Sequence, residues 1–127
     1  MINFNKDSTW DLKPISLENV RSEVAGMLTD GEQPICAFKT IRDQIIFTNK
    51  RIIAIDVQGV TGTRKSYTSM PYSRIQFYSI QTPRIMEVVP DSELQLMFSN
   101  GFTATFEFKG NVDIIALNRI ISTFALK

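Results

Sequence analysis

The residue types that perform most enzyme chemistry are sparse in this chain of 127 residues. Histidine is absent, which removes the commonest general base and the commonest metal ligand. The single cysteine, Cys36, stands between Ile35 and Ala37, a setting typical of a buried structural thiol, and it has no histidine to activate it. The acidic residues show no metal-ligand spacing, as five scattered positions illustrate: Asp11, Glu18, Asp43, Asp56 and Asp91. The sequence therefore predicts a protein that is not an enzyme and needs no cofactor or metal.

Four basic residues near predicted turns are the candidates for contacts with an anion: Lys50, Arg51, Arg64 and Lys65. Ordinary solvated charge is the alternative interpretation of all four. The net charge is only +1, from 14 basic and 13 acidic residues, so the chain lacks the basic footprint of a nucleic-acid-binding domain. The same balance gives little attraction to an anionic membrane. We therefore expect no nucleic acid as partner, and a membrane lipid is disfavoured.

Composition is that of an ordinary soluble domain, with 43% hydrophobic and 21% charged residues. A chain of this length buries enough surface for one domain with a core of its own. The first residues contain no apolar stretch of signal-peptide length, and no segment approaches the roughly 18–20 apolar residues of a membrane span. These features predict a cytoplasmic protein.

The elements that would position any site are mostly short strands. Residues 16–28 predict a helix, because apolar residues recur there at the helical period after Ser16, a plausible N-cap. Five strands are predicted next, with a two-residue turn at Asn49-Lys50 that relies on the tolerance of asparagine for positive φ: 35–41, 44–48, 51–57, 64–70 and 74–80. Residues 85–89, between Pro83 and Pro90, are interpreted as a short edge strand.

The last hairpin has the clearest pattern. Apolar and polar residues alternate over 93–99 and again over 102–109, and Asn100-Gly101 between them is the strongest two-residue hairpin turn. Asn111 is the predicted cap of a final amphipathic helix over 112–125. Strands framed by helices in this order predict the α+β class, as a sandwich or barrel with one end covered by the last helix.

Short motifs spread over 16–125 resemble the bacterial pleckstrin-homology domain family through their order and spacing: GEQ at 31–33, RD at 42–43, FTNKR at 47–51, DVQGVTG at 56–62, PYSRI at 71–75 and SEL at 92–94. The resemblance implies a bent antiparallel sandwich or barrel of about seven strands with a C-terminal capping helix. The helix predicted at 16–28 would be an addition to that fold. Residues 1–14 would be an N-terminal extension and residues 15–127 the domain.

The resemblance also implies a cytoplasmic, non-enzymatic interaction or scaffold module that self-associates into a ring-like homo-oligomer, with no assigned cellular role. A lipid- or peptide-binding adaptor, with an unknown protein or peptide partner, is the alternative. Apolar residues left over from the predicted core are candidates for the contacts between copies: Trp10, Ile85, Met86, Val88 and Ile115. Trp10 as a tether on its own domain and Ile115 as an ordinary exposed residue are the competing interpretations. The sequence departs from the family at 81–84, where QTPR replaces the usual Glu-Thr-Ala-Gly.

Overall fold

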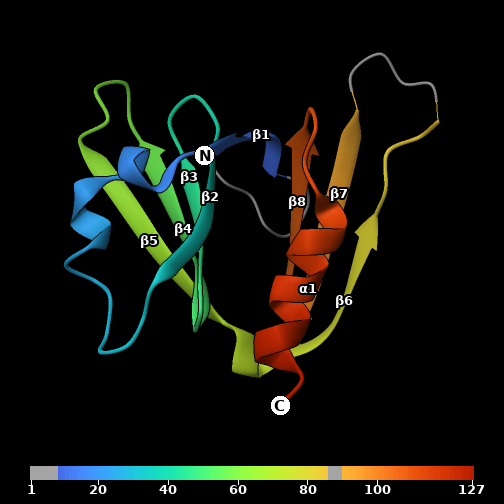
Figure 1. Ribbon diagram of the computed structural model, residues 1–127. Coiled ribbons are helices and arrows are strands. Elements are labelled where there is room, and N and C mark those ends of the chain that lie inside the picture. Colours follow the sequence, from blue (N-terminus) through green and yellow to red (C-terminus); the bar gives the residue numbers. More distant parts are fainter. Residues whose placement is uncertain (1–8, 86–89) are drawn as a thin grey trace. The chain divides into compact units, whose positions relative to one another are not determined.

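The computed structural model describes residues 9–85 and 90–127 (Figure 1). The chain divides into two compact units. Pro14–Pro71 form the first unit. Tyr72–Lys127 form the second unit together with residues 9–13 of the described N-terminal part.

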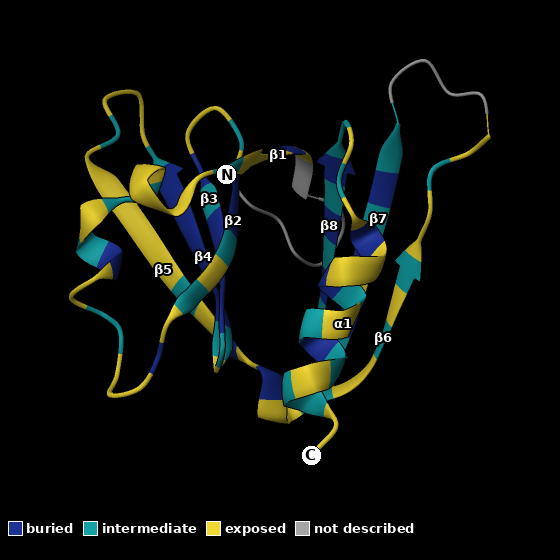
Figure 2. Cartoon of the chain, viewed as in Figure 1, coloured by how far each residue is buried: buried dark blue, intermediate teal, exposed yellow. Residues whose placement is uncertain are grey.

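The first unit is built on an antiparallel meander of four strands. These are β2 (Pro34–Lys39), β3 (Gln44–Thr48), β4 (Arg51–Gln58) and β5 (Arg64–Pro71), and each pairs with the next. The strands β3 and β4 are apolar on both faces and are buried along almost their whole length, whereas β5 is exposed at most positions (Figure 2). The sequence located all four strands to within two residues at each end, because β-branched runs were separated by recognisable turns.

The helix predicted at 16–28 is wrong. Two short 3₁₀ turns stand there instead, η1 (Leu17–Asn19) and η2 (Ser22–Val24), and Ser16 makes no side-chain cap. Extended backbone at Val20 and Arg21 separates the two turns, and the Arg21 N–H donates to the Gln44 side chain instead of continuing a helix. The apolar period nevertheless identified Val24 of the core cluster of this unit and three residues that pack against the cluster, Val20, Met27 and Leu28, whereas Leu17 is exposed.

The second unit has a sheet of four strands covered by one helix. The strands β6 (Ile75–Gln81), β7 (Asp91–Phe98) and β8 (Thr103–Lys109) form an antiparallel meander. The helix α1 (Ile114–Ala125) contacts β6, β7 and the short turn η3 (Tyr72–Arg74). The ring of Phe124 in α1 stacks on Tyr72 of η3, with the two ring centroids 5.5 Å apart.

The fourth strand of this sheet was not predicted. It is β1 (Thr9–Ile15), which pairs in parallel with β8 at Thr9↔Phe106 and Leu12↔Phe108. The described chain therefore has eight strands where about seven were expected, and β1 runs through the boundary that the sequence placed at residue 14. The strand was not recognised in the sequence because the residues of this segment are mixed and polar. Of its residues from Asp11 onward, Leu12 alone is fully buried.

The last hairpin is confirmed in detail. The predicted inner residues of β7 and β8 are buried, and the outer residues that alternate with them are more exposed. Gly101 takes the positive φ of 89° that the turn requires. A strict period of two, joined by an Asn-Gly turn, leaves only one register that buries a whole face.

The final helix begins two residues later than predicted, and its cap is Asp113 instead of Asn111. The Asp113 carboxylate accepts a hydrogen bond from the Ala116 N–H at 3.0 Å. Asp113 immediately precedes the first helical residue, so its side chain is the one placed to reach an unpaired N–H of the first turn.

Replacing Asp113 by alanine is expected to lower the free energy of unfolding by about 1 kcal/mol, because the first turn of α1 loses its only side-chain cap. Asn111→Ala, two residues earlier and exposed, is the matched control and should change stability little. Urea denaturation of both variants followed by circular dichroism measures the difference. A larger loss from Asn111→Ala would place the functional cap where the sequence first suggested it.

Candidate functional site

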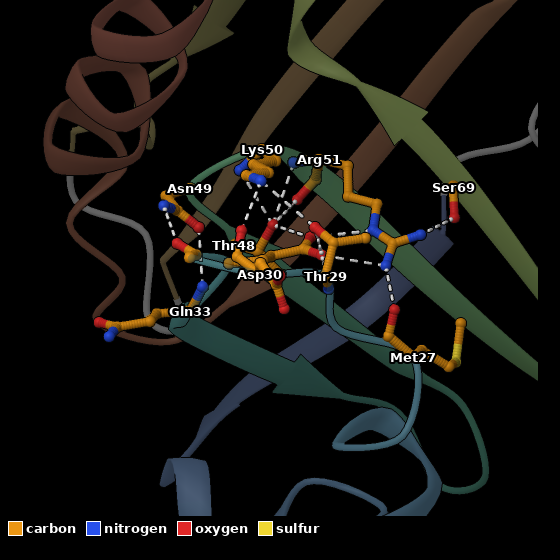
Figure 3. Close-up of polar contacts among 11 residues, drawn as sticks. Met27, Thr29, Asp30, Gln33, Thr48, Asn49, Lys50, Arg51 and Ser69 are labelled. Atoms are coloured by element: carbon orange, nitrogen blue, oxygen red, sulfur yellow. Dashed lines mark hydrogen bonds and ion pairs between the residues drawn. The ribbon is translucent and has the colours of Figure 1, made fainter.

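A buried ion pair joins the segment before β2 to Arg51, the first residue of β4 (Figure 3). The Glu32 side chain is only 1% exposed. The Arg51 Nε donates to Glu32 Oε2 at 2.9 Å, and the second nitrogen of the fork, Nη2, donates to Oε1 at 3.1 Å. The same guanidinium also donates to the Met27 carbonyl at 2.8 Å and to the Ser69 hydroxyl at 2.9 Å. All three Arg51 nitrogens are therefore engaged within the protein.

Two threonines complete the binding of the carboxylate. Thr29 donates to Glu32 Oε1 through its N–H at 3.0 Å and its hydroxyl at 3.2 Å, while the Thr48 hydroxyl donates to Oε2 at 2.7 Å. Burial alone would raise the pKa of Glu32, but the hydrogen bonds from Arg51, Thr29 and Thr48 and the Arg51 charge outweigh it and lower the pKa from 4.5 to about 2. We call this arrangement of Glu32, Arg51, Thr29 and Thr48 the Glu32–Arg51 clamp.

The turn at Asn49-Lys50 serves the clamp by a different mechanism from the predicted one. Among the described residues, Asp11 alone has positive φ without being glycine, so Asn49 is not in the conformation that the sequence argument invoked. Its carboxamide instead accepts from the Gln33 N–H at 2.7 Å and donates to the Gly31 carbonyl at 3.0 Å. Lys50 Nζ donates to the Asp30 carbonyl at 2.9 Å. Lys50 and Arg51 therefore hold backbone and carboxylate in place.

The four candidate anion contacts do not converge. Arg64 and Lys65 pair with Gln58 and Val57 at one end of the β4–β5 ladder, whereas Arg51 lies opposite Pro71 at the other end. Six residues of strand separate the two ends, which is about 20 Å at 3.3 Å per residue. Arg64 and Lys65 are exposed, but Lys50 and Arg51 cannot share a ligand with them.

The short connection Arg42-Asp43 is bound to the loop that precedes Arg64. The Arg42 guanidinium donates to the Gly59 carbonyl, and a carboxylate oxygen of Asp43 accepts from the Val57 N–H at 2.8 Å. Asp43 is buried, with 7% of its surface exposed. The charged groups of Arg42 and Asp43 are therefore both used to hold this loop in place.

The candidate oligomer contacts are described only in part. Ile85 is 93% exposed just after β6, and Ile115 is 65% exposed on α1. Met86 and Val88 lie outside the described residues, and of Trp10 only the backbone, in β1, is described. All five stay predictions.

Sequence reasoning missed an unguarded sheet edge. The strand β6, of sequence IQFYSIQ, contains no charged residue, no proline and no glycine, and within residues 9–85 and 90–127 it pairs with β7 alone. Phe77 in its centre is 54% exposed. The absence of charge over seven residues was the signal, but only the strand order shows that this segment lies at an edge.

An acidic patch borders one end of β6. We use this name for Asp91, Glu93 and Glu107 on β7 and β8. Glu93 stands directly opposite Glu107, and on its other side it pairs with Gln81, the last residue of β6. Burial raises the pKa of Glu107, and the charges of Asp91, Glu93 and Asp11 raise it further against the opposing effect of Lys109. The ammonium group of Lys109 forms its ion pair with the Asp91 carboxylate, at 3.6 Å, and the described ion pairs include none to Glu93 or Glu107.

The described residues offer no conventional catalytic or metal centre. Within them, no group of three or more His, Cys, Asp or Glu side chains is placed to hold a metal ion. Burial raises the pKa of the Cys36 thiol to about 11, so the thiol is protonated at neutral pH. Across residues 9–85 and 90–127, no helix has the length and apolar character that crossing a membrane requires.

Comparison with known proteins gives one consistent family. Bacterial PH domain sequences match residues 3–125. The uncharacterised protein YjqA of Bacillus subtilis is 32% identical over 114 residues, which cover 88% of this chain and 90% of that protein. The uncharacterised protein YozO of the same organism is 29% identical over 108 residues, covering 85% and 91%.

Solved structures agree with the sequence matches. A DUF1696 family protein with a pleckstrin-homology domain from Shewanella loihica aligns with a TM-score of 0.78 at 34% identity, covering 91% of this chain and 97% of that one. A pleckstrin homology domain from Shewanella amazonensis aligns with a TM-score of 0.66 at 34% identity, covering 89% and 90%. The predicted pleckstrin-homology fold with its C-terminal helix is therefore confirmed, without the extra N-terminal helix.

Proposed function

Because this chain belongs to the bacterial pleckstrin-homology domain family, we propose that it is a non-enzymatic interaction module that self-associates into a ring-like homo-oligomer. The family relation supports a binding role by analogy with the pleckstrin-homology fold, because the relatives themselves are uncharacterised proteins. The observation that carries self-association is the uncharged edge of β6.

An exposed edge strand presents a row of unpaired N–H and C=O groups that can pair with another chain. Natural proteins usually guard such an edge with lysine, proline or a pronounced bulge. The strand β6 has an irregular register between Ile75 and Phe77, but the five residues from Phe77 to Gln81 pair regularly with β7 and carry no charge. This length of regular, uncharged edge is enough to add a strand from a second copy.

The alternative of a lipid-binding adaptor has less support from the geometry. A headgroup site needs several cations converging on one point, and the described basic candidates lie at opposite ends of a ladder with Arg51 committed to Glu32. An extended peptide remains the other occupant that the β6 edge would accept, and the experiment below separates it from a second copy.

Light scattering of the wild-type protein at tens of micromolar is expected to give a mass above that of a dimer. The double variant Phe77→Lys, Ser79→Lys should reduce this mass to that of one chain, because two charges would then guard the edge. The matched control is Thr103→Lys, Thr105→Lys, which adds the same charge to β8, a strand that does not pair with β6.

Two outcomes would count against the proposal. A wild-type monomer would remove self-association and leave the peptide as the occupant of the β6 edge. A double β6 variant that stays folded by circular dichroism and keeps the wild-type mass would show that copies meet elsewhere.

A further inference from the structure

A second strand of the described chain also ends a sheet. The strand β5 pairs with β4 alone within the residues described, and its side chains are exposed at its first four positions. Its two charged residues, Arg64 and Lys65, stand together at the start, and the six residues that follow carry no charge. The edge of β5 is therefore polarised, with a basic end and an uncharged end.

The edge of β6 has the opposite polarity. Its Gln81 end borders the acidic patch through Glu93, with Glu107 one strand further from the edge, whereas its Ile75 end meets Phe98 and Met97 of β7. Like charges directly opposite each other, as at Glu93 and Glu107, disfavour the sheet unless a cation lies nearby. Lys109 lies close enough to Glu107 to oppose the rise in its pKa, but its ion pair is with Asp91. The described ion pairs therefore give the three carboxylates of the patch one cation, and the patch can accept further positive charge from outside.

Charge complementarity distinguishes the possible pairings. Antiparallel pairing of two β6 strands would set Gln81 beside Ile75 and would bring no basic residue to either acidic patch. Parallel pairing of β6 with β5 would set the basic end beside Ile75. Antiparallel pairing of β6 with β5 sets Arg64 and Lys65 beside Gln81 and the acidic patch.

We infer that the strand added to β6 is β5 of a second copy, antiparallel, with Arg64 and Lys65 at the end of β6 that borders the acidic patch. This inference rests on the proposed self-association and names its partner segment. The two strands match in length, with eight and seven residues. Because successive side chains point to opposite faces, one of the two basic residues lies on the face of Glu93 and Glu107 in any register.

The pairing is heterologous, because each copy offers β6 to one neighbour and β5 to another. Such a contact leaves one free edge at each end of any open chain of copies and is satisfied throughout only when the assembly closes. Pairing of β6 with β6 would instead stop at a dimer. A β5–β6 contact can therefore continue through three or more copies until the assembly closes, as the proposed ring requires.

Reversing the charge at the basic end of β5 tests whether charge complementarity drives the pairing. The variant Arg64→Glu, Lys65→Glu is expected to raise the concentration at the midpoint of assembly by about tenfold or more, because several pairs turn repulsive together. Adding Glu93→Lys and Glu107→Lys to the same chain should restore assembly. The control Lys39→Glu, Lys127→Glu changes the net charge equally at two basic residues outside both edges.

Cross-linking tests strand direction in a Cys36→Ser background. Alignment of Arg64 with Gln81 places Ser66 opposite Ser79, so a mixture of Ser66→Cys and Ser79→Cys chains should form disulfide-linked pairs on mild oxidation. Lys65→Cys with Gln76→Cys, which parallel pairing would bring together, should not. Linking in a mixture of Phe77→Cys and Ser79→Cys chains, which antiparallel pairing of two β6 strands would bring together, would indicate two β6 strands instead.

The outcomes separate the inference from the proposed function. A monomeric wild-type protein would contradict both. An oligomeric wild-type protein that ignores charge reversal, or that links through Lys65→Cys and Gln76→Cys, would keep self-association and overturn the choice of antiparallel β5.

Discussion

Replacing Phe106 by alanine is expected to lower the free energy of unfolding by about 3–5 kcal/mol. Phe106 is fully buried in β8, directly opposite Leu94 of β7, and β8 is paired with β1 along its other edge. A tightly paired site of this kind cannot collapse to fill the cavity left behind. The loss is a large part of the 5–15 kcal/mol that stabilises a domain.

Urea denaturation measures this loss, with Thr105→Ala as the neighbouring control. Thr105 lies on the opposite face of the same strand and is partly exposed, so its replacement by alanine should lower the free energy of unfolding by well under half as much. Equal losses from the two variants would mean that the faces of β8 are assigned the wrong way round.

The second large effect concerns the Glu32–Arg51 clamp. Glu32→Gln keeps the shape of the side chain but leaves the Arg51 guanidinium, itself 19% exposed, without its counter-charge. Removing one partner of a buried ion pair typically destabilises a protein by about 3–5 kcal/mol. The expected loss of unfolding free energy at pH 7 is about 3 kcal/mol, because Arg51 keeps some contact with solvent. Glu18→Gln, at an exposed carboxylate, is the matched control.

The same variant predicts a pH dependence. The pKa of Glu32 is about 2 in the folded protein and 4.5 as a reference, so the unfolded chain binds its proton more readily. Its contribution is therefore complete above about pH 4.5 and disappears as the pH falls towards 2. Urea midpoints of wild type and Glu32→Gln should differ at pH 7 and converge near pH 2. A gap that persists at pH 2 would assign the loss to packing instead of charge.

The sequence predicted best where local and long-range preferences coincide. Residues 93–109 specify strand, turn and buried face together, and the structure reproduces all three. Residues 16–28 specify only most of the side chains that pack on the core. Their backbone follows tertiary bonds such as that from Arg21 to Gln44, which a helical period does not contain.

The candidate site was harder to predict, because its members meet only in the folded chain. Glu32 and Arg51 are 19 residues apart and nothing in their neighbours marks them as partners. Arg51 therefore resembled a solvated charge near a turn. The β6 edge was equally hidden, since a strand's place in a sheet depends on pairings with residues far along the chain.

The parallel pairing of β1 with β8 has a consequence for the order of events during synthesis. Each strand of the β2–β5 meander finds its neighbour within a few residues of chain, so this part can form soon after residue 71 leaves the ribosome. Thr9, by contrast, waits for Phe106, 97 residues later. The part of β1 that pairs with β8 is thus made first and placed late, and until then its backbone must be kept from pairing with another chain.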